Sequence, residues 1–297
     1  MFYKSMYSIP NERKKQIDKM LQLLQVSGKS KHTINNYYCA ILRFFKYFHD
    51  CDLLTLNESN ILEYLKINYL DKNCSARTYN MNLCAIRYFY TVNFNIEFNR
   101  KLLPNSKIKK NLPTIIEHST FIKIFNGENN LKHKCWLLLA YTSGLRAEEV
   151  AKINISDINS NQHQLKVLGK GNKERFTVLT DITIKYLKAY FKKYCYLKYK
   201  TDNNYKGYLF EGHEDADYIN SNSITNYFSD IKQKYNLNKS ITFHTLRHSF
   251  ATNFIKAGGD PFILKDMMGH ASLNTTSIYI HMGRDFNNLK GVNYDKI

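Results

Sequence analysis

The sequence lacks a long apolar run. No stretch approaches the roughly 18 residues of a membrane-spanning helix, and the first residues do not form the apolar core of a secretion signal. The longest apolar run, residues 135–141, has the length of a buried helix segment. We therefore expect no membrane span and no membrane partner.

The sequence also lacks the signatures of metal sites and of several enzyme classes. Its six cysteines are widely separated and form no C-x-x-C pair, which argues against structural zinc and against a disulfide framework and predicts reduced thiols in a cytoplasmic protein. It contains no G-x-x-x-x-G-K-[ST] nucleotide loop, no H-E-x-x-H and no G-x-S-x-G elbow. We expect neither a metal nor a cofactor.

Acidic residues are few relative to basic ones. The chain has 25 Asp and Glu against 43 Lys and Arg, a formal net charge of +18. Such an excess attracts polyanions, so a nucleic-acid partner is favoured over a merely solvated basic surface. A membrane surface is a weaker alternative, because the basic residues are spread over both halves of the chain.

Helical periodicity dominates the first hundred residues. Apolar side chains recur at helical spacing in residues 11–26, 31–49, 57–68 and 75–93, which predicts a four-helix domain over residues 1–98. Residues 99–112 show no sustained period and include a basic cluster. They predict an extended linker that lies close to a polyanionic partner.

Residues 113–297 predict a second domain with helices and one small sheet. Helices are expected over residues 114–126, 131–142, 181–199 and 223–235 and from Arg146 and His244 onward, with the last two helices carrying His270 and Tyr279. Residues 164–169 and 175–179 predict a β-hairpin around a glycine-rich turn. The expected fold class is mainly α with a small β-sheet, a four-helix domain followed by an α+β domain.

Four motifs in the second domain carry charged and nucleophilic side chains. They are Thr142-Ser143-Gly144-Leu145-Arg146-Ala147-Glu148-Glu149, His244-x-x-Arg247, Gly269-His270 and Tyr279. In this order they resemble the signature boxes of the tyrosine recombinases of the phage integrase family. The chain is similar in length to the short Xer-like members, with no room for an additional N-terminal DNA-binding domain. The resemblance implies a SAM-like core-binding domain, a catalytic domain, and strand exchange through a 3′-phosphotyrosyl intermediate.

Two arginines in these motifs suit a phosphate. A guanidinium matches two phosphate oxygens and stays protonated at any working pH, so Arg146 and Arg247 can supply the positive charge that the reaction needs. An arbitrary arginine of a basic protein is a surface charge, but the motifs single these two out. Glu149 lies three residues after Arg146, so it either holds that guanidinium in place or forms an ordinary surface pair with it.

The expected nucleophile is Tyr279. A phenol has a reference pKa of about 10, so it needs cationic surroundings and a proton acceptor before it attacks. His244 and His270 are candidates to hydrogen-bond the scissile phosphate, and His244 is also the favoured proton acceptor. His248 is expected to point away from the face of His244 and to be structural.

Lysines and arginines outside these motifs are candidates for DNA contacts. Lys170, at the tip of the hairpin, fits the general acid for the leaving 5′-oxygen, with Lys173 as its competitor and a solvated turn as the alternative for both. Each of the other candidates is by itself an ordinary surface charge, but as a set they suit phosphate contacts that position the protein on a duplex. The DNA-binding set is Lys31, Arg43, Arg77, Arg87, Lys109, Lys110 and Lys173.

The resemblance implies a site-specific recombinase that integrates, excises or resolves DNA. It implies a tetramer on two double-stranded DNA sites, with or without accessory factors, in a cytoplasmic protein that is nucleoid-associated while it acts, as in many mobile elements. Two rivals share the fold: a non-catalytic DNA-binding accessory protein, and a topoisomerase-like enzyme that nicks and closes DNA. Tyr279 and the two arginines argue against the first rival. Relaxation without strand exchange would favour the second.

Overall fold

The computed structural model describes residues 9–108, 112–169, 173–213, 216–270 and 272–284. The chain divides into two compact units, Met1–Lys110 and Asn111–Ile297, which we call the first and the second unit. Within the described residues, no helix is both long and apolar enough to cross a membrane.

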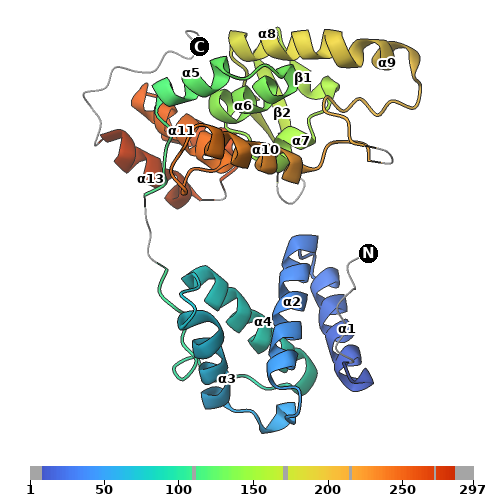
Figure 1. Ribbon diagram of the computed structural model, residues 1–297, viewed down its shortest axis with the longest axis vertical. Coiled ribbons are helices and arrows are strands. Elements are labelled where there is room, and N and C mark those ends of the chain that lie inside the picture. The colour runs from blue at the N-terminus through green and yellow to red at the C-terminus, as the bar shows by residue number, and fades with distance from the viewer. Residues whose placement is uncertain (1–8, 109–111, 170–172, 214–215, 271, 285–297) are drawn as a thin grey trace. The chain divides into compact units, whose positions relative to one another are not determined.

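The first unit is built on the four predicted helices, which are confirmed. They are α1 (Asn11–Val26), α2 (Lys31–Tyr47), α3 (Glu58–Leu65) and α4 (Ala76–Phe94), with the short turns η1 (Leu53–Thr55) and η2 (Lys66–Leu70) on either side of α3. Ser30, Asn57 and Ser75 begin α2, α3 and α4, and each side chain accepts a hydrogen bond from the first helical turn. Figure 1 shows α2 beside α1 and α4, and the core between these helices is rich in aromatic rings.

The segment after α4 packs onto the first unit. Leu103 is fully buried in its core, and Asn80 exchanges two hydrogen bonds with Ser106, of 2.9 and 2.8 Å. Part of the segment predicted as a linker from residue 99 onward therefore packs against the first unit. The sequence did not indicate this packing, because the segment finds its partners through single buried groups, which leave no periodic pattern.

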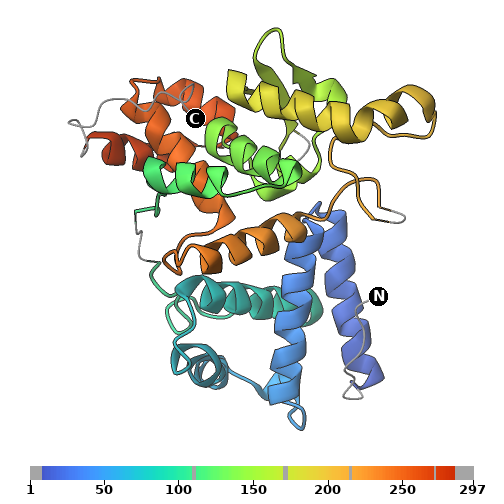
Figure 2. The ribbon, with the colours of Figure 1, turned by 45° about the horizontal axis from the view of Figure 1, so that its top comes forward.

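The second unit is mostly helical and contains one three-stranded sheet. Its helices are α5 (His118–Asn126), α6 (Leu131–Ser143), α7 (Ala147–Ala151), α8 (Asp181–Tyr190), α9 (Tyr196–Thr201), α10 (Ser221–Lys234), α11 (Phe243–Lys256), α12 (Pro261–Met268) and α13 (Leu273–Arg284), with the turns η3 (Ile155–Asp157) and η4 (Phe191–Cys195). From Cys135 to its end, α6 is buried, as its uninterrupted apolar run predicts. Figures 1 and 2 show α11 alongside α6, and α11 also packs against α13.

The sheet contains the predicted hairpin and one further strand. β1 (Ile158–Asn159), β2 (Gln164–Leu168) and β3 (Glu174–Val178) are antiparallel in the order β1-β2-β3. The sequence predicted only two strands, because a strand of two residues is too short to show alternation. Val167 lies opposite Arg175, so Arg175 shares the inward face of β3 with the buried Thr177.

The structure places one predicted site residue, His270, differently from the prediction. Gly269 ends α12 with a φ of 62°, and His270 lies in the loop that follows, so the prediction of a helix carrying His270 is wrong. Tyr279 lies on α13, the last helix described, as predicted. A glycine at the end of a helix takes the left-handed conformation at low cost, which explains why the helix stops one residue before the histidine.

Candidate active site

The carboxylate of Glu149 is surrounded by three arginines. Its Oε1 accepts hydrogen bonds from Nη1 of Arg146 at 2.8 Å and Nη1 of Arg175 at 2.9 Å. Its Oε2 accepts from the backbone N–H of Arg146 at 2.8 Å and from Nη2 of Arg175 at 2.9 Å, while Nη1 of Arg247 lies 3.6 Å away. Burial acts to raise the pKa of Glu149, but the bonds and charges of these arginines outweigh it and hold the pKa below its usual 4.5. The cluster keeps a surplus of positive charge, which suits an anionic ligand.

Arg146 is the accessible member of the cluster. Its side chain is 37% exposed, against 8% for Arg175 and 1% for Arg247. It begins α7 directly after the turn in which Gly144 ends α6 with a φ of 68°. A Cβ at Gly144 would lie 2.5 Å from Cδ1 of Phe250, so this turn needs glycine for its conformation and for its space.

Arg247 is buried on α11 and ties two other elements together. Its guanidinium donates to the carbonyl oxygens of Gly144, in the turn that leads to Arg146, and of Met268, the last residue of α12 before the turn that leads to His270. Burial and the charge of Arg146 lower the pKa of Arg247 to about 9, against the opposing effect of Glu149. Two segments more than a hundred residues apart in the sequence thus meet at one guanidinium.

The hydroxyl of Tyr279 is held by a histidine. Nδ1 of His248 lies 2.6 Å from the Tyr279 hydroxyl oxygen, and the Tyr279 side chain is buried. Burial raises the pKa of Tyr279, while the nearby charges of Arg247 and Arg146 lower it. The phenol therefore lies close enough to Arg146 and Arg247 to feel the positive charge of both.

His248 is not placed as the sequence interpretation expected. Its ring centroid lies 4.6 Å from that of His244, so the two histidines share one face of α11. The expectation that His248 points away from His244 is wrong, because residues four apart on a helix are neighbours. That spacing was the signal in the sequence that could have identified it.

His270 completes the group from the loop after α12. Its ring is stacked on that of Tyr279 with centroids 6.2 Å apart, and its Nδ1 lies 2.9 Å from the Thr276 hydroxyl. Burial, with the nearby arginine charges, lowers the pKa of His270 to about 4. Partial desolvation first, and the charge of Arg247 after it, likewise lowers the pKa of His244 to about 4, although the residue as a whole is exposed. Both imidazoles are therefore neutral near pH 7.

Arg175 is a member of the cluster that the sequence interpretation missed. Besides its two bonds to Glu149, its Nε donates to the Met267 carbonyl at 2.8 Å. The strand pattern could have identified it. Arg175 falls on the same face of β3 as Thr177, and a charged side chain is unusual on the buried face of a strand.

The predicted DNA-binding residues are placed in different ways. Lys31, Arg43, Arg77 and Lys173 are exposed. Arg87 donates to the Leu103 carbonyl and, at 3.0 Å, to Asn105 Oδ1, so its donors already serve the first unit. Lys109, Lys110 and the general-acid candidate Lys170 lie outside the described residues, and the role of the whole set stays a prediction.

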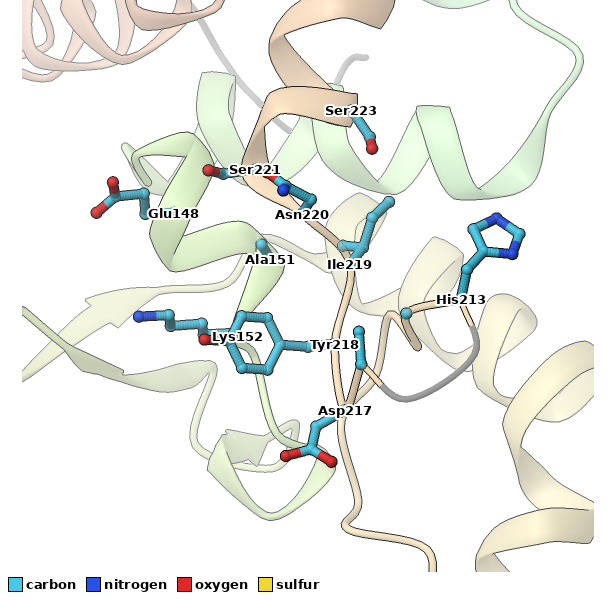
Figure 3. Close-up of a pocket in the computed structure, with 12 residues that line it drawn as sticks. Glu148, Ala151, Lys152, His213, Asp217, Tyr218, Ile219, Asn220, Ser221 and Ser223 are labelled. Carbon is cyan, nitrogen blue, oxygen red and sulfur yellow. The ribbon is translucent and has the colours of Figure 1, made fainter. Parts of the chain in front are cut away.

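A cavity of about 700 Å³ lies beside α7, and Glu149 is not among its lining residues (Figure 3). It lies between α7 and the start of α10, and its lining includes Glu148, Lys152, Tyr218 and Ser221. None of the clustered arginines, histidines or Tyr279 lines it. Across the described ranges there is also no group of three or more His, Cys, Asp or Glu side chains placed to hold a metal ion.

Family models match both parts of the chain. Residues 109–284 match the model of the phage integrase family, and residues 17–98 match that of the phage integrase N-terminal SAM-like domain. The first match covers more than half of the sequence and includes every residue of the cluster described above.

Similar proteins are found in bacteria and archaea. The tyrosine recombinase XerD of Staphylococcus haemolyticus is 27% identical over 281 residues, covering 90% of this chain and 94% of the relative. The tyrosine recombinase XerA of Pyrococcus horikoshii is 29% identical over 264 residues, covering 89% and 87%.

Solved structures with the same fold include two complexes with DNA. The XerH recombinase in a post-cleavage complex with a palindromic difH substrate has a TM-score of 0.71 at 22% identity, covering 95% of this chain and 88% of that one. A lambda integrase dimer bound to a COC' core site also has a TM-score of 0.71, at 17% identity and with 96% and 98% covered.

Proposed function

Because the chain belongs to the phage integrase family, we propose that it is a site-specific tyrosine recombinase that cuts and rejoins DNA strands. One observation carries the proposal. The Tyr279 hydroxyl lies 2.6 Å from Nδ1 of His248 and its ring stacks on that of His270, while Arg247, next to His248 on α11, lies with Arg146 around Glu149. Two arginine cations and neutral histidines beside a phenol are what transfer of a phosphoryl group to tyrosine requires. The DNA complexes of similar structures support double-stranded DNA as the substrate.

Arg146 and Arg247 bind the scissile phosphate in this proposal. Glu149 fixes Arg146 through one guanidinium nitrogen, which leaves the other donors of this partly exposed side chain for phosphate oxygens. His244 and His270 add hydrogen bonds, because a neutral imidazole donates from the ring nitrogen that carries the proton. Charge that develops on the phosphate is thus stabilised by groups already in place.

Tyr279 is the nucleophile. A bond forms between its hydroxyl oxygen and phosphorus while the bond from phosphorus to the 5′-oxygen breaks. The phenol proton passes to a neutral histidine, His244 or His248, and Lys170 donates a proton to the leaving 5′-oxygen. Attack by a 5′-hydroxyl on the phosphotyrosine reverses these steps and rejoins DNA. The bond energy is kept in the phosphotyrosyl intermediate, so rejoining needs no nucleotide triphosphate. Arg146 and Arg247 supply the positive charge that a metal ion would otherwise provide, so the proposal includes no metal or other cofactor.

The wider setting follows from this chemistry. Exchange between two sites requires four cleavage events, so we place four copies of the chain on two DNA sites. The reaction suits the excision, integration or resolution of DNA, as in mobile elements, with or without accessory factors. A protein that acts on chromosomal DNA works in the cytoplasm of a bacterial or archaeal cell, at the nucleoid while it acts.

Covalent trapping tests the proposal. Duplexes selected by binding from fragmented genomic DNA are nicked near the scissile phosphate and incubated with the full chain in EDTA. We expect an SDS-resistant protein–DNA adduct with the wild type and with Tyr194→Phe, an exposed tyrosine of the same unit, but not with Tyr279→Phe. Tyr279→Phe should still bind the duplex.

Three results would contradict parts of the proposal. Binding without any adduct from the wild type would make the chain an accessory DNA-binding protein. An adduct with Tyr279→Phe would place the nucleophile elsewhere. Relaxation of a plasmid without exchange between two sites would point to a topoisomerase-like activity.

A further inference from the structure

Arg175 has the contacts of a positioning residue for the phosphate-binding arginines. Arg175 belongs to β3, the strand that follows the hairpin turn, and its side chain is 8% exposed. Its guanidinium plane faces Glu149 with two parallel bonds, both of 2.9 Å, while Nε is bonded to the Met267 carbonyl at 2.8 Å. A planar fork held at three points has little freedom to turn.

The hydrogen bonds of Glu149 explain what this fork does. A carboxylate offers about four lone-pair sites, and Arg175 fills two of them while the backbone and side chain of Arg146 fill the others. No site is left for Arg247, which stays 3.6 Å away and donates to two carbonyls instead. Because Arg175 occupies two acceptor sites of Glu149, this carboxylate cannot accept further hydrogen bonds from Arg146 or Arg247.

Arg175 also contacts the turn that precedes His270. Met267, whose carbonyl it binds, lies three residues before His270, and a Cβ added at Gly269 would lie 3.0 Å from Cδ of Arg175. The arginine stem therefore passes directly beneath this turn. One side chain joins the hairpin strand, the support of Arg146 and the loop that carries His270.

We infer that Arg175 is a positioning residue of the recombination site, which sets the orientation of Arg146 through Glu149 and the place of His270 through the Met267–Gly269 turn. This inference rests on the proposed function. Arg175 acts through these neighbours and does not itself touch the DNA. Its loss should therefore impair the steps that need the cationic side chains, while leaving DNA binding by the rest of the surface in place.

Arg175→Lys tests this role because it keeps the charge and the stem but loses the fork. A lysine cannot form two parallel bonds to a carboxylate and also donate sideways to a carbonyl. Misplacement of a catalytic group by about 1 Å can cost about 100-fold in rate, so we expect adduct formation to slow by about 10- to 100-fold. Lys198→Met, which removes a cation bonded to Glu211 elsewhere in the same unit, should react like the wild type.

A second substrate separates positioning from a general loss of structure. In a methylphosphonate, a methyl group replaces one non-bridging oxygen, so the reacting group carries no negative charge and depends less on arginine. The deficit of Arg175→Lys relative to wild type should shrink by at least about tenfold on this substrate, as should that of Arg146→Ala, the reference variant. If Arg175→Lys does not melt cooperatively, Arg175→Gln, which can still donate to Glu149, is compared in the same way.

The possible outcomes are distinct. Slow cleavage of phosphate with relief on methylphosphonate supports the inference. Wild-type rates on phosphate, or equal deficits on both substrates, overturn it. If neither Arg175→Lys nor Arg175→Gln folds, Arg175 is a requirement of the fold and the inference is overturned. Failure of the proposed function would be recognised by a different result, because the wild type itself would then give no adduct on either substrate.

Discussion

Replacing the carboxylate of Glu149 should destabilise the second unit strongly. In Glu149→Gln the amide offers one acceptor oxygen in place of two and points N–H donors at Arg146 or Arg175. Three arginine charges would then face each other with no anion between them, at a site where the Glu149 side chain is only 6% exposed. The matched control is Glu148→Gln, because Glu148 is the neighbouring residue of α7 and is exposed.

The magnitude follows from the burial of the cluster. Removing one partner of a buried ion pair costs about 3–5 kcal/mol. Arg146 is 37% exposed and can turn toward water, so we expect the lower end, about 3 kcal/mol. For a unit of this size each kcal/mol shifts the melting temperature by about 2–4 °C, so Glu149→Gln should melt about 6–12 °C below the control.

Tryptophan fluorescence provides the assay. The chain has a single tryptophan, Trp136, which is buried in α6, so its emission reports the second unit alone even if the first unit melts separately. The difference between the variants should also depend on pH. Glu149 has a folded pKa below the usual 4.5, so its contribution is complete above that pH and is lost as the pH falls through the folded value.

Two results would refute this reasoning. If Glu149→Gln melted within about 2 °C of Glu148→Gln, less than about 1 kcal/mol would separate them, and the cluster could not be the buried network described. If the difference persisted unchanged well below pH 4.5, the carboxylate charge would not be its source.

Three further tests address other parts of the structure. Partial burial lowers the pKa of His248 to about 4 from its usual 6.5, so this histidine stabilises the fold fully above pH 6.5 and less as the pH falls toward 4. His248→Gln should therefore flatten the pH dependence of Trp136-monitored melting in that window, and an unchanged slope would contradict a half-buried, neutral imidazole. Gly144→Ala should lower the free energy of unfolding, measured by urea denaturation, by about 1–3 kcal/mol more than Gly258→Ala does. Both glycines have positive φ, but only Gly144 has atoms in the way of a Cβ. Equal losses of unfolding free energy in the two variants would rule out the clash. Arg77→Ala should reduce the slope of log binding constant against log salt concentration by about one. Arg87→Ala should leave that slope unchanged and instead lower the melting temperature measured by circular dichroism, because Arg87 bonds to Leu103 and Asn105. A lower slope for Arg87→Ala would mean that Arg87 contacts phosphate.

Much of the fold was readable from the sequence because its signals are local. Apolar spacing and the capping residues Ser30, Asn57 and Ser75 determine where the helices of the first unit begin and which faces they bury. The motifs likewise placed Arg146, Arg247 and Tyr279 on helical segments, since each motif is only a few residues long. Family models match the same regions.

Other features depend on contacts between distant segments. Leu103 joins the core of the first unit through one buried side chain, and β1 exists only because β2 lies beside it, so neither leaves a periodic signal. The role of His248 depends on how α13 packs against α11, which brings the Tyr279 hydroxyl to its ring. Helical spacing could show that His244 and His248 share a face, but not what that face meets.

The sequence by itself determined which side chains carry charge and nucleophilic character, and on which local elements they lie. Only the tertiary structure decided that Glu149 would be enclosed by Arg146, Arg175 and Arg247. The physical reason is that a buried carboxylate must find its donors wherever the chain brings them, and β3 and α11 are brought to α7 by the packing of the whole unit around α6.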